Sequence, residues 1–313
     1  MMVETVVSSA LPVDELLSIR KNRLEPDHQS GREKRICIVT GTHGDELEGQ
    51  YVCYEVNRRI QSQMENLKGI VDIYPALNPL GVDSITRGIP KFDLDMNRIF
   101  PGNKEGSMAE YIASEIVNDI DGADLCIDIH SSNIFLQEIP QVRISEETAK
   151  KLVPMAKYLN VDFIWVHSAA TVLESTLAHT MNMRGVPTLV VEMGVGMRIT
   201  KAYCEQLVDG IFALMREEGI WDGEVIQPRE PVVSTDGEVS FINAEASGVF
   251  IPMVEHWKNV KKGDPIGDIV EPLTGKILHH IDSPVDGEVF TLREYPVVYE
   301  GSLIARILGG IER

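Results

Sequence analysis

The chain has 313 residues, of which 48 are acidic and 29 are basic, giving a formal net charge of −19 at pH 7. A chain of this length can bury a large core, and we expect two domains. The excess of negative charge argues against nucleic acids and anionic membrane surfaces as partners. We recognise no signal peptide and no apolar run of about eighteen residues, so the cytoplasm is the expected location.

The first 225 residues alternate between apolar, strand-like runs and amphipathic, helical stretches. Residues 1–34 are polar and mixed, with a short helix expected over 13–20. Strands are expected at 35–40, 69–75, 124–129 and 187–192, and helices at 47–66, 107–120, 145–158, 172–183 and 200–218. This alternation predicts an α/β fold, with a mixed, mostly parallel sheet flanked by helices over residues 1–225.

After residue 225 the helical pattern ends and short strand-like segments alternate with turn dipeptides, which predicts an all-β domain over 226–313. Its segments 260–267 and 283–289 resemble the barrel-sandwich domains that carry biotin or lipoate. Those carriers present a lysine at a hairpin tip, flanked by methionines or acidic residues. Lys276 has no such flanks, so we interpret it as an unmodified surface lysine. We expect the domain to wall the active site or to mediate assembly into a homo-oligomer.

Four cysteines are scattered along the chain without C-x-x-C spacing: Cys37, Cys53, Cys126 and Cys204. Two of them fall in expected strands. We interpret all four as reduced packing residues rather than disulfide partners or zinc ligands.

Two polar residues, His43 and Glu46, lie between the expected strand at 35–40 and the expected helix at 47–66. Strand ends of an α/β sheet face a crevice, so a His-x-x-Glu sequence there can supply two ligands to one zinc ion. Taken alone, the motif also fits an ordinary polar loop.

His130, at the end of the expected strand at 124–129, is the candidate third ligand. Positions two apart in a strand share a face, so Asp128 can orient the imidazole ring of His130. The alternative is an ordinary core histidine at a strand end. Three protein ligands would leave one position for water, as in catalytic zinc sites.

Three further residues suit a hydrolytic site. Asn97 and Arg98 precede a Phe-Pro-Gly turn signal, and an arginine fork with a neighbouring amide can bind a carboxylate. The alternative is a surface ion pair of Arg98 with Asp93 or Asp95. Glu192 ends the apolar strand at 187–192, where a carboxylate is costly to bury unless it is paired or acts as an acid or base. A structural glutamate that caps the next segment is the other interpretation.

Four motifs occur in order: Gly41-Thr-His-Gly-Asp-Glu-Leu-Glu-Gly49, residues 93–102 (DLDMNRIFPG), Asp128-Ile-His130 and Val190-Val-Glu-Met-Gly194. This set resembles the succinylglutamate desuccinylase/aspartoacylase family, a branch of the zinc carboxypeptidase-like hydrolases. The resemblance implies one zinc ion held by His43, Glu46 and His130.

The same resemblance implies roles for other residues. Glu192 would be the general base, Asn97 and Arg98 would bind the substrate carboxylate, and Arg87 would polarise the scissile carbonyl. Tyr299 would correspond to a substrate-contacting tyrosine, with Tyr295 as a competing choice. Two more arginines, Arg184 and Arg198, flank the Glu192 strand, and the sequence does not decide whether either one recognises an acidic acyl group.

Three functions follow from these observations. The leading one is a zinc-dependent amidohydrolase that removes the acyl group from a small N-acyl amino acid or a related amine that carries a carboxylate. The second is a metallocarboxypeptidase acting on short peptides. The third is a non-catalytic binding protein that retains the fold. The intact set of His43, Glu46, His130 and Glu192 argues against the third.

Overall fold

A large mixed sheet runs through the molecule in the computed structural model, which describes residues 2–90, 92, 94–167, 174–235 and 238–309. Its central strands are parallel and lie in the order β4 (Ile70–Tyr74), β3 (Arg35–Val39), β5 (Leu125–Ser131) and β8 (Thr188–Gly194). All four were predicted from their apolar runs. Because they are parallel, their carboxyl ends meet at one edge of the sheet, where α/β proteins place their sites.

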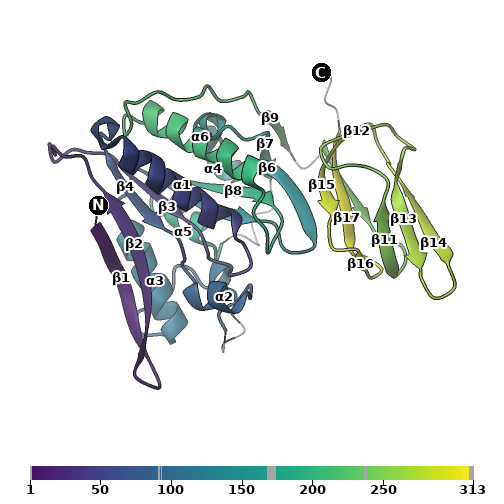
Figure 1. Cartoon of the computed structure of the whole chain (residues 1–313), viewed down its shortest axis with the longest axis horizontal. Helices are drawn as coiled ribbons and strands as arrows, with labels where there is room; N and C mark the ends of the chain where they lie inside the picture. Colours follow the sequence, from purple (N-terminus) through teal and green to yellow (C-terminus); the bar gives the residue numbers. More distant parts are fainter. Residues whose placement is uncertain (1, 91, 93, 168–173, 236–237, 310–313) are drawn as a thin grey trace.

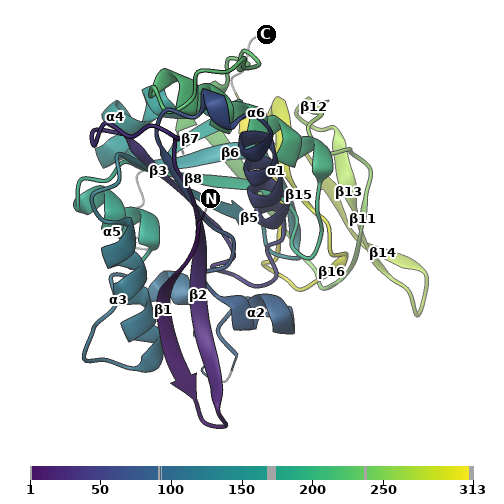
Figure 2. The ribbon, with the colours of Figure 1, turned by 60° about the vertical axis from the view of Figure 1, so that its left-hand side comes forward.

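Helices cover both faces of this sheet, as the alternating pattern predicts (Figure 2). One face carries α1 (Glu48–Ser62), α4 (Glu146–Ala156) and α6 (Lys201–Glu217). The opposite face carries α3 (Met108–Ile120) and α5 (Leu177–Met183). The predicted helix over 172–183 begins in residues that lie outside the described part of the chain. Short helical turns connect these elements: α2 (Pro79–Ser84), η1 (Met64–Asn66), η2 (Met96–Arg98) and η3 (Lys157–Leu159).

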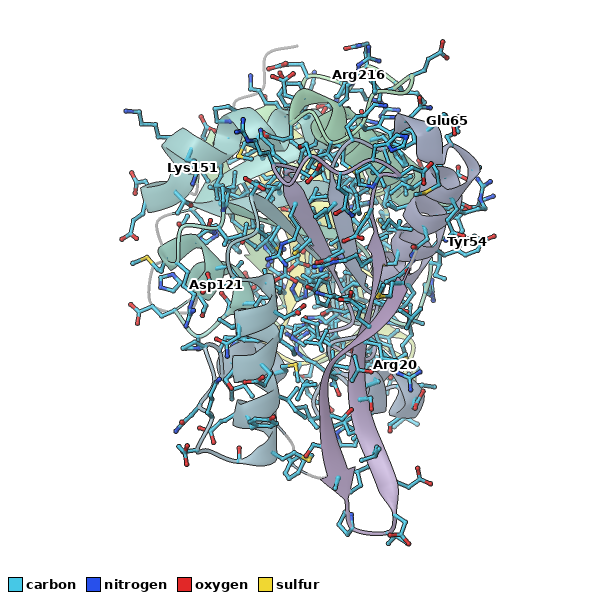
Figure 3. The ribbon with its side chains drawn as sticks, turned by 90° about the vertical axis from the view of Figure 1, so that its left-hand side faces the viewer. Arg20, Tyr54, Glu65, Asp121, Lys151 and Arg216 are labelled. Carbon is cyan, nitrogen blue, oxygen red and sulfur yellow. The ribbon has the colours of Figure 1, made fainter. Side chains whose placement is uncertain are left out.

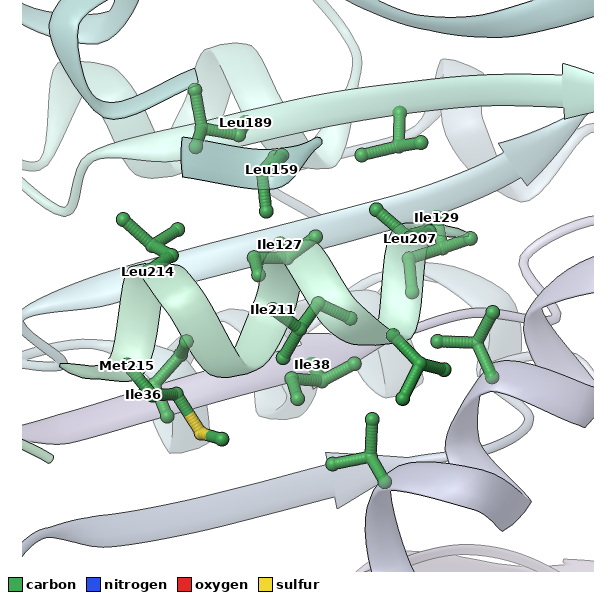
Figure 4. Close-up of a cluster of buried hydrophobic side chains, with 14 of the residues drawn as sticks. Ile36, Ile38, Ile127, Ile129, Leu159, Leu189, Leu207, Ile211, Leu214 and Met215 are labelled. Carbon is green, nitrogen blue, oxygen red and sulfur yellow. The ribbon is translucent and has the colours of Figure 1, made fainter. Parts of the chain in front are cut away.

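The packing of α6 shows why the helical pattern is informative. Leu207, Ile211, Leu214 and Met215 recur at helical spacing and are fully buried. They lie above the strand residues Ile36, Ile38, Ile127 and Ile129, whose alternate positions share one face (Figure 4). This packing holds the strand ends at fixed positions for the site.

The N-terminal segment corrects the sequence interpretation. Residues 13–20 are not helical, because β1 (Met2–Leu11) and β2 (Glu15–Leu24) form an antiparallel hairpin at one edge of the sheet. The buried side chains of β2 include Leu17, Ile19 and Lys21, with a period of two. The period is hard to recognise because the buried lysine occupies an apolar position, where it pairs with Asp72 and Asp119.

Three strands continue the sheet beyond β8; β6 and β7 were not predicted, whereas β9 lies in the region predicted to be all-β. The strand β6 (Leu136–Ser145) runs antiparallel to β8, and β7 (Phe163–His167) runs parallel to β6. The strand β9 (Val232–Thr235) then pairs with β7. Together they carry the sheet towards the C-terminal region.

The C-terminal region is all-β, as predicted. The strands β10 (Val239–Asn243), β12 (Asn259–Val260), β15 (Gly287–Arg293) and β17 (Leu303–Gly309) extend the large sheet, with β15 pairing directly with β6 (Figure 1). A second, antiparallel sheet contains β11 (Gly248–Pro252), β13 (Pro265–Glu271), β14 (Lys276–Asp282) and β16 (Val297–Val298). A domain boundary at residue 225 stays a prediction, because the shared sheet crosses it.

Charged side chains such as Glu65, Lys151 and Arg216 are exposed on the outside of the molecule (Figure 3). Among the helices in the described part of the chain, none combines the length and the apolar character that crossing a membrane requires.

Candidate metal centre and active site

The loop between β3 and α1 presents His43 and Glu46, and its glycines shape it. Gly41 has a φ of +66°, which favours glycine. Gly44 lies so close to α2 that an added Cβ would be 1.9 Å from the carbonyl carbon of Gly81. The backbone N–H of Gly44 also donates to the carbonyl oxygen of Thr86 at 3.0 Å. These contacts hold the two functional side chains at the carboxyl end of β3.

His43, Glu46 and His130 converge on one point. The Nδ1 atom of His43 lies 2.8 Å from Oε1 of Glu46, and the Nδ1 atom of His130 lies 2.9 Å from Oε2. All three side chains are buried, with at most 4% exposure. One potential ligand atom from each residue lies within 4.8 Å of the others. The predicted ligand set is therefore brought together from β5 and the β3–α1 loop.

An aspartate supports each imidazole from behind. Asp95 accepts a hydrogen bond from Nε2 of His43 at 3.0 Å, and Asp128 lies 3.2 Å from Nε2 of His130. Both rings consequently turn Nδ1 toward Glu46. The carboxylate–histidine pairing is the arrangement that orients metal-bound histidines in proteins. Asp128 was predicted in this role, whereas Asp95 was missed, although it lies two residues before Asn97 in the same motif.

The donor set fits a zinc ion. Two imidazole nitrogens and one carboxylate, all facing one point, match the three-ligand sites of zinc hydrolases. The buried Nδ1 atom of His43 has no hydrogen-bond partner among the described residues, although it faces Glu46. Burial alone would raise the pKa of Glu46, but the imidazoles of His130 and His43 outweigh it and hold that pKa well below its usual range. The ionised carboxylate is the form that binds a metal.

Glu192 lies beside the cluster because β8 pairs with β5 in a register that places Glu192 opposite His130. Its Oε1 atom accepts from Nη1 of Arg143 at 3.3 Å. Burial raises the pKa of Glu192 above its ordinary value, and Arg143 and His130 act against this rise. A carboxyl group with a raised pKa can accept a proton and pass it on near neutral pH.

Arg87, predicted to polarise the scissile carbonyl, lies beside the cluster, as do Asn97 and Arg98, predicted to bind the substrate carboxylate. Arg87 donates from Nη1 to Glu46 at 2.9 Å, and its Nη2 atom lies 3.4 Å from Asp95. Asn97 is buried and accepts from the backbone N–H of Leu177 at 3.0 Å. Arg98 is exposed and donates to the carbonyl oxygen of Asn97 at 2.8 Å.

Of the two surface pairings suggested for Arg98, the one with Asp95 is not seen among the described residues. Asp95 pairs with His43 and Arg87 instead, and Asp93 lies outside the described residues.

A cavity of about 580 Å³ joins these groups, lined by His43, Glu46, Arg87, Asn97, Arg98, Asp128, His130 and Glu192. Tyr299 is not among the lining residues and is 72% exposed. Its competitor Tyr295 packs edge-on against Phe135, which does line the cavity, with ring centroids 5.8 Å apart. Contact of Tyr299 with substrate stays a prediction without support from this geometry.

Other arginines divide into two groups. Arg184 and Arg198 do not line the cavity and form exposed ion pairs with Asp121 and Glu294. Arg143 and Arg306 do line it, and sequence reasoning missed both. Their positions depend on β6 and on strand pairing across the whole chain, which no local pattern reveals.

Comparison with known proteins agrees with these observations. The sequence profile of the succinylglutamate desuccinylase/aspartoacylase catalytic domain matches residues 32–217. The N-alpha-acetyl-L-2,4-diaminobutyric acid deacetylase of Halomonas elongata is 24% identical over 241 residues, which cover 75% of this chain and 70% of that protein.

Solved structures share the fold over nearly the whole chain. A succinylglutamate desuccinylase/aspartoacylase from Rhodobacter sphaeroides aligns with a TM-score of 0.82 and 20% identity, covering 99% of this chain and 96% of that one. The product-bound ectoine utilization protein EutE (DoeB) from Ruegeria pomeroyi aligns with a TM-score of 0.82 and 21% identity, covering 98% and 95%. The resemblance seen in the four sequence motifs is confirmed, and the chain belongs to the succinylglutamate desuccinylase/aspartoacylase family of deacylases.

Proposed function

We propose that this protein is a zinc-dependent deacylase that hydrolyses the amide bond of a small N-acyl amino acid or a related N-acyl amine. The observation that carries the proposal is the convergence of His43, Glu46 and His130 in one cavity with Glu192 and three basic or amide side chains. Zinc bound there would polarise the amide carbonyl and lower the pKa of a water molecule in the site.

Each protein group has a defined task in this proposal. Glu192 accepts a proton from the attacking water and delivers it to the leaving amine, which its raised pKa favours. Arg87 directs its guanidinium donors at the oxygen on which negative charge develops. Asn97 and Arg98 bind the carboxylate of the substrate and so orient the amide.

A deacylase acting on small acylated amino acids is better supported than the second candidate, a metallocarboxypeptidase acting on short peptides. The Halomonas elongata relative is named as a deacetylase of an N-acetyl diamino acid, and the family is one of deacylases. A non-catalytic binding protein is disfavoured because the protein groups that the proposal requires, including His43, His130 and Glu192, lie in one cavity. A cytoplasmic location and assembly into a homo-oligomer stay predictions.

A substrate panel tests the proposal. It contains N-acetyl, N-succinyl and N-formyl amino acids, Nα-acetyl-2,4-diaminobutyric acid, and dipeptides with a blocked amino terminus and a free C-terminal carboxylate. We expect release of the acyl group from at least one N-acyl amino acid, with slower or no cleavage of the dipeptides. Cleavage of the dipeptides alone would favour the carboxypeptidase.

The general base is tested with Glu192→Gln, for which we expect turnover to fall roughly a hundredfold or more. Glu147→Gln is the matched control, because Glu147 is exposed and lines the same cavity. It should keep turnover within a few-fold of the parent. A Glu192→Gln variant as active as this control would remove Glu192 from the mechanism.

A further inference from the structure

A row of polar side chains crosses the large sheet from the catalytic strands into the C-terminal region. Strand pairing places Gln141 of β6 opposite Glu192 of β8, and Glu138 of β6 opposite Thr291 of β15. Thr291 in turn lies opposite Arg306 of β17. Residues far apart in the sequence therefore lie side by side next to the active site.

Glu138 is the centre of this row. Its side chain is 1% exposed, and its two oxygens accept from four donors. Gln141 and Thr291 donate to Oε2 at 2.8 and 2.6 Å. Arg306 and Arg143 donate to Oε1 at 2.7 and 3.2 Å. A buried carboxylate with this many partners has a fixed position.

Arg143 connects Glu138 to Glu192. Its Nη2 atom donates to Glu138, while Nη1 donates to Glu192 at 3.3 Å. The guanidinium groups of Arg143 and Arg306 both lie over the ring of Trp165, with Cζ 5.6 Å and 5.5 Å from the ring centroid, respectively. Two cations can share such a site only because the carboxylate of Glu138 lies between them. The position of Arg143 thus depends on Glu138, and that of Glu138 on Arg306.

We propose that Arg306 is a positioning residue of the active site, which acts through Glu138 and Arg143 to hold the carboxylate of Glu192 in its working orientation. The proposal rests on the proposed function, because it needs Glu192 to be the general base. It also assigns a task to the C-terminal region beyond walling the cavity. A base displaced by about 1 Å can lose roughly a hundredfold in rate, so this support has a measurable effect.

The alternative is that the row only joins the two regions of the molecule. The two explanations predict different effects on kcat when substitutions of Arg306 and Glu192 are combined. If Arg306 acts through Glu192, its loss has no further effect on kcat once Glu192 is already glutamine. If it only stabilises the fold, the two substitutions combine independently.

The experiment compares Arg306→Met in the parent and in the Glu192→Gln background, with the panel compound that gives the highest kcat/KM. Methionine keeps an unbranched apolar stem but removes the charge and the guanidinium donors. We expect kcat to fall about tenfold or more in the parent, with KM and zinc content close to the parent values. The melting temperature should fall, because Glu138 loses a buried partner. We expect no further fall in kcat in the Glu192→Gln background.

Arg198→Met is the matched control, because Arg198 also forms an ion pair across the two regions, with Glu294 at 2.6 Å, but is 65% exposed and lies outside the cavity lining. Its kcat should equal that of the parent. If Arg306→Met does not fold, Arg306→Lys gives the same comparison, because lysine keeps the charge but lacks the forked donors.

Two results would overturn the inference: an unchanged kcat for the Arg306 variant, or an equal fall in both backgrounds. If Glu192→Gln itself keeps full turnover, the general-base assignment fails instead. An inactive Glu192→Gln beside a fully active Arg306 variant rejects only the positioning role.

Discussion

Asp95 joins the candidate metal cluster to the loop that carries Asn97 and Arg98. It accepts from Nε2 of His43 at 3.0 Å and from the backbone N–H of Asn97 at 2.9 Å, and it lies 3.4 Å from Nη2 of Arg87. Asp95→Asn replaces one carboxylate oxygen by an NH2 group and removes the negative charge. We expect this single change to weaken zinc binding and turnover together.

The magnitude follows from what the substitution keeps. One oxygen remains and can still accept from both His43 and Asn97, so the local geometry survives. The charge that makes the imidazole of His43 a better ligand is lost, together with the attraction to Arg87. Loss of such a supporting carboxylate costs about 10- to 100-fold in metal affinity. Because the acceptor is retained, we expect the lower end, about tenfold, or roughly 1.4 kcal/mol.

The assay is competition for zinc between the protein and a chromophoric chelator at fixed pH. Asp83→Asn is the control, because Asp83 is an exposed residue of α2 outside the cavity lining. Zinc affinity of the control should match the parent. An Asp95→Asn variant with the affinity of the parent would refute the idea that this carboxylate supports a metal-bound histidine.

Other parts of the structure give three further predictions. Gly44→Ala should cost roughly 1–3 kcal/mol in unfolding free energy and should lower turnover, because the added Cβ meets the backbone of Gly81; normal activity in a stable variant would contradict the tight loop. Burial raises the pKa of Cys37 and Cys53 to about 12, so iodoacetamide at pH 8 should label neither thiol before unfolding; labelling of the native protein would show that they are accessible. Burial lowers the pKa of His256, so its contribution to stability is complete above about pH 6.5 and declines as the pH falls through the lowered pKa. His256→Gln should therefore reduce the decrease in unfolding free energy that the parent shows on acidification. The same dependence of unfolding free energy on pH in variant and parent would contradict this.

The sequence predicts which residues come together at the centre of the candidate site, because these residues follow strand ends. A short apolar run marks each central strand, and the polar residue that follows must lie at the carboxyl edge of the sheet. His43, His130 and Glu192 are all found in this way. Glu46 follows because its spacing from His43 matches a two-ligand motif.

The outer parts of the site depend on contacts that no local pattern reveals. For Asp95 the sequence suggests only a surface ion pair with Arg98, because the loop that brings it to His43 has no periodic pattern. Arg143 was missed along with β6, which contains a proline and several polar residues that face the cavity. Arg306 reaches the site through pairing of β17, β15 and β6, and this pairing exists only in the folded chain.

The central claim is that His43, Glu46 and His130 hold a zinc ion required for hydrolysis. The most direct measurement is a titration of metal-free protein with zinc while acyl release from an N-acyl amino acid of the panel is followed. Activity should rise linearly and stop rising at one zinc per chain, and His130→Ala should show no such rise. Full activity in the metal-free protein, or no activity at any zinc level with every panel compound, would contradict the account.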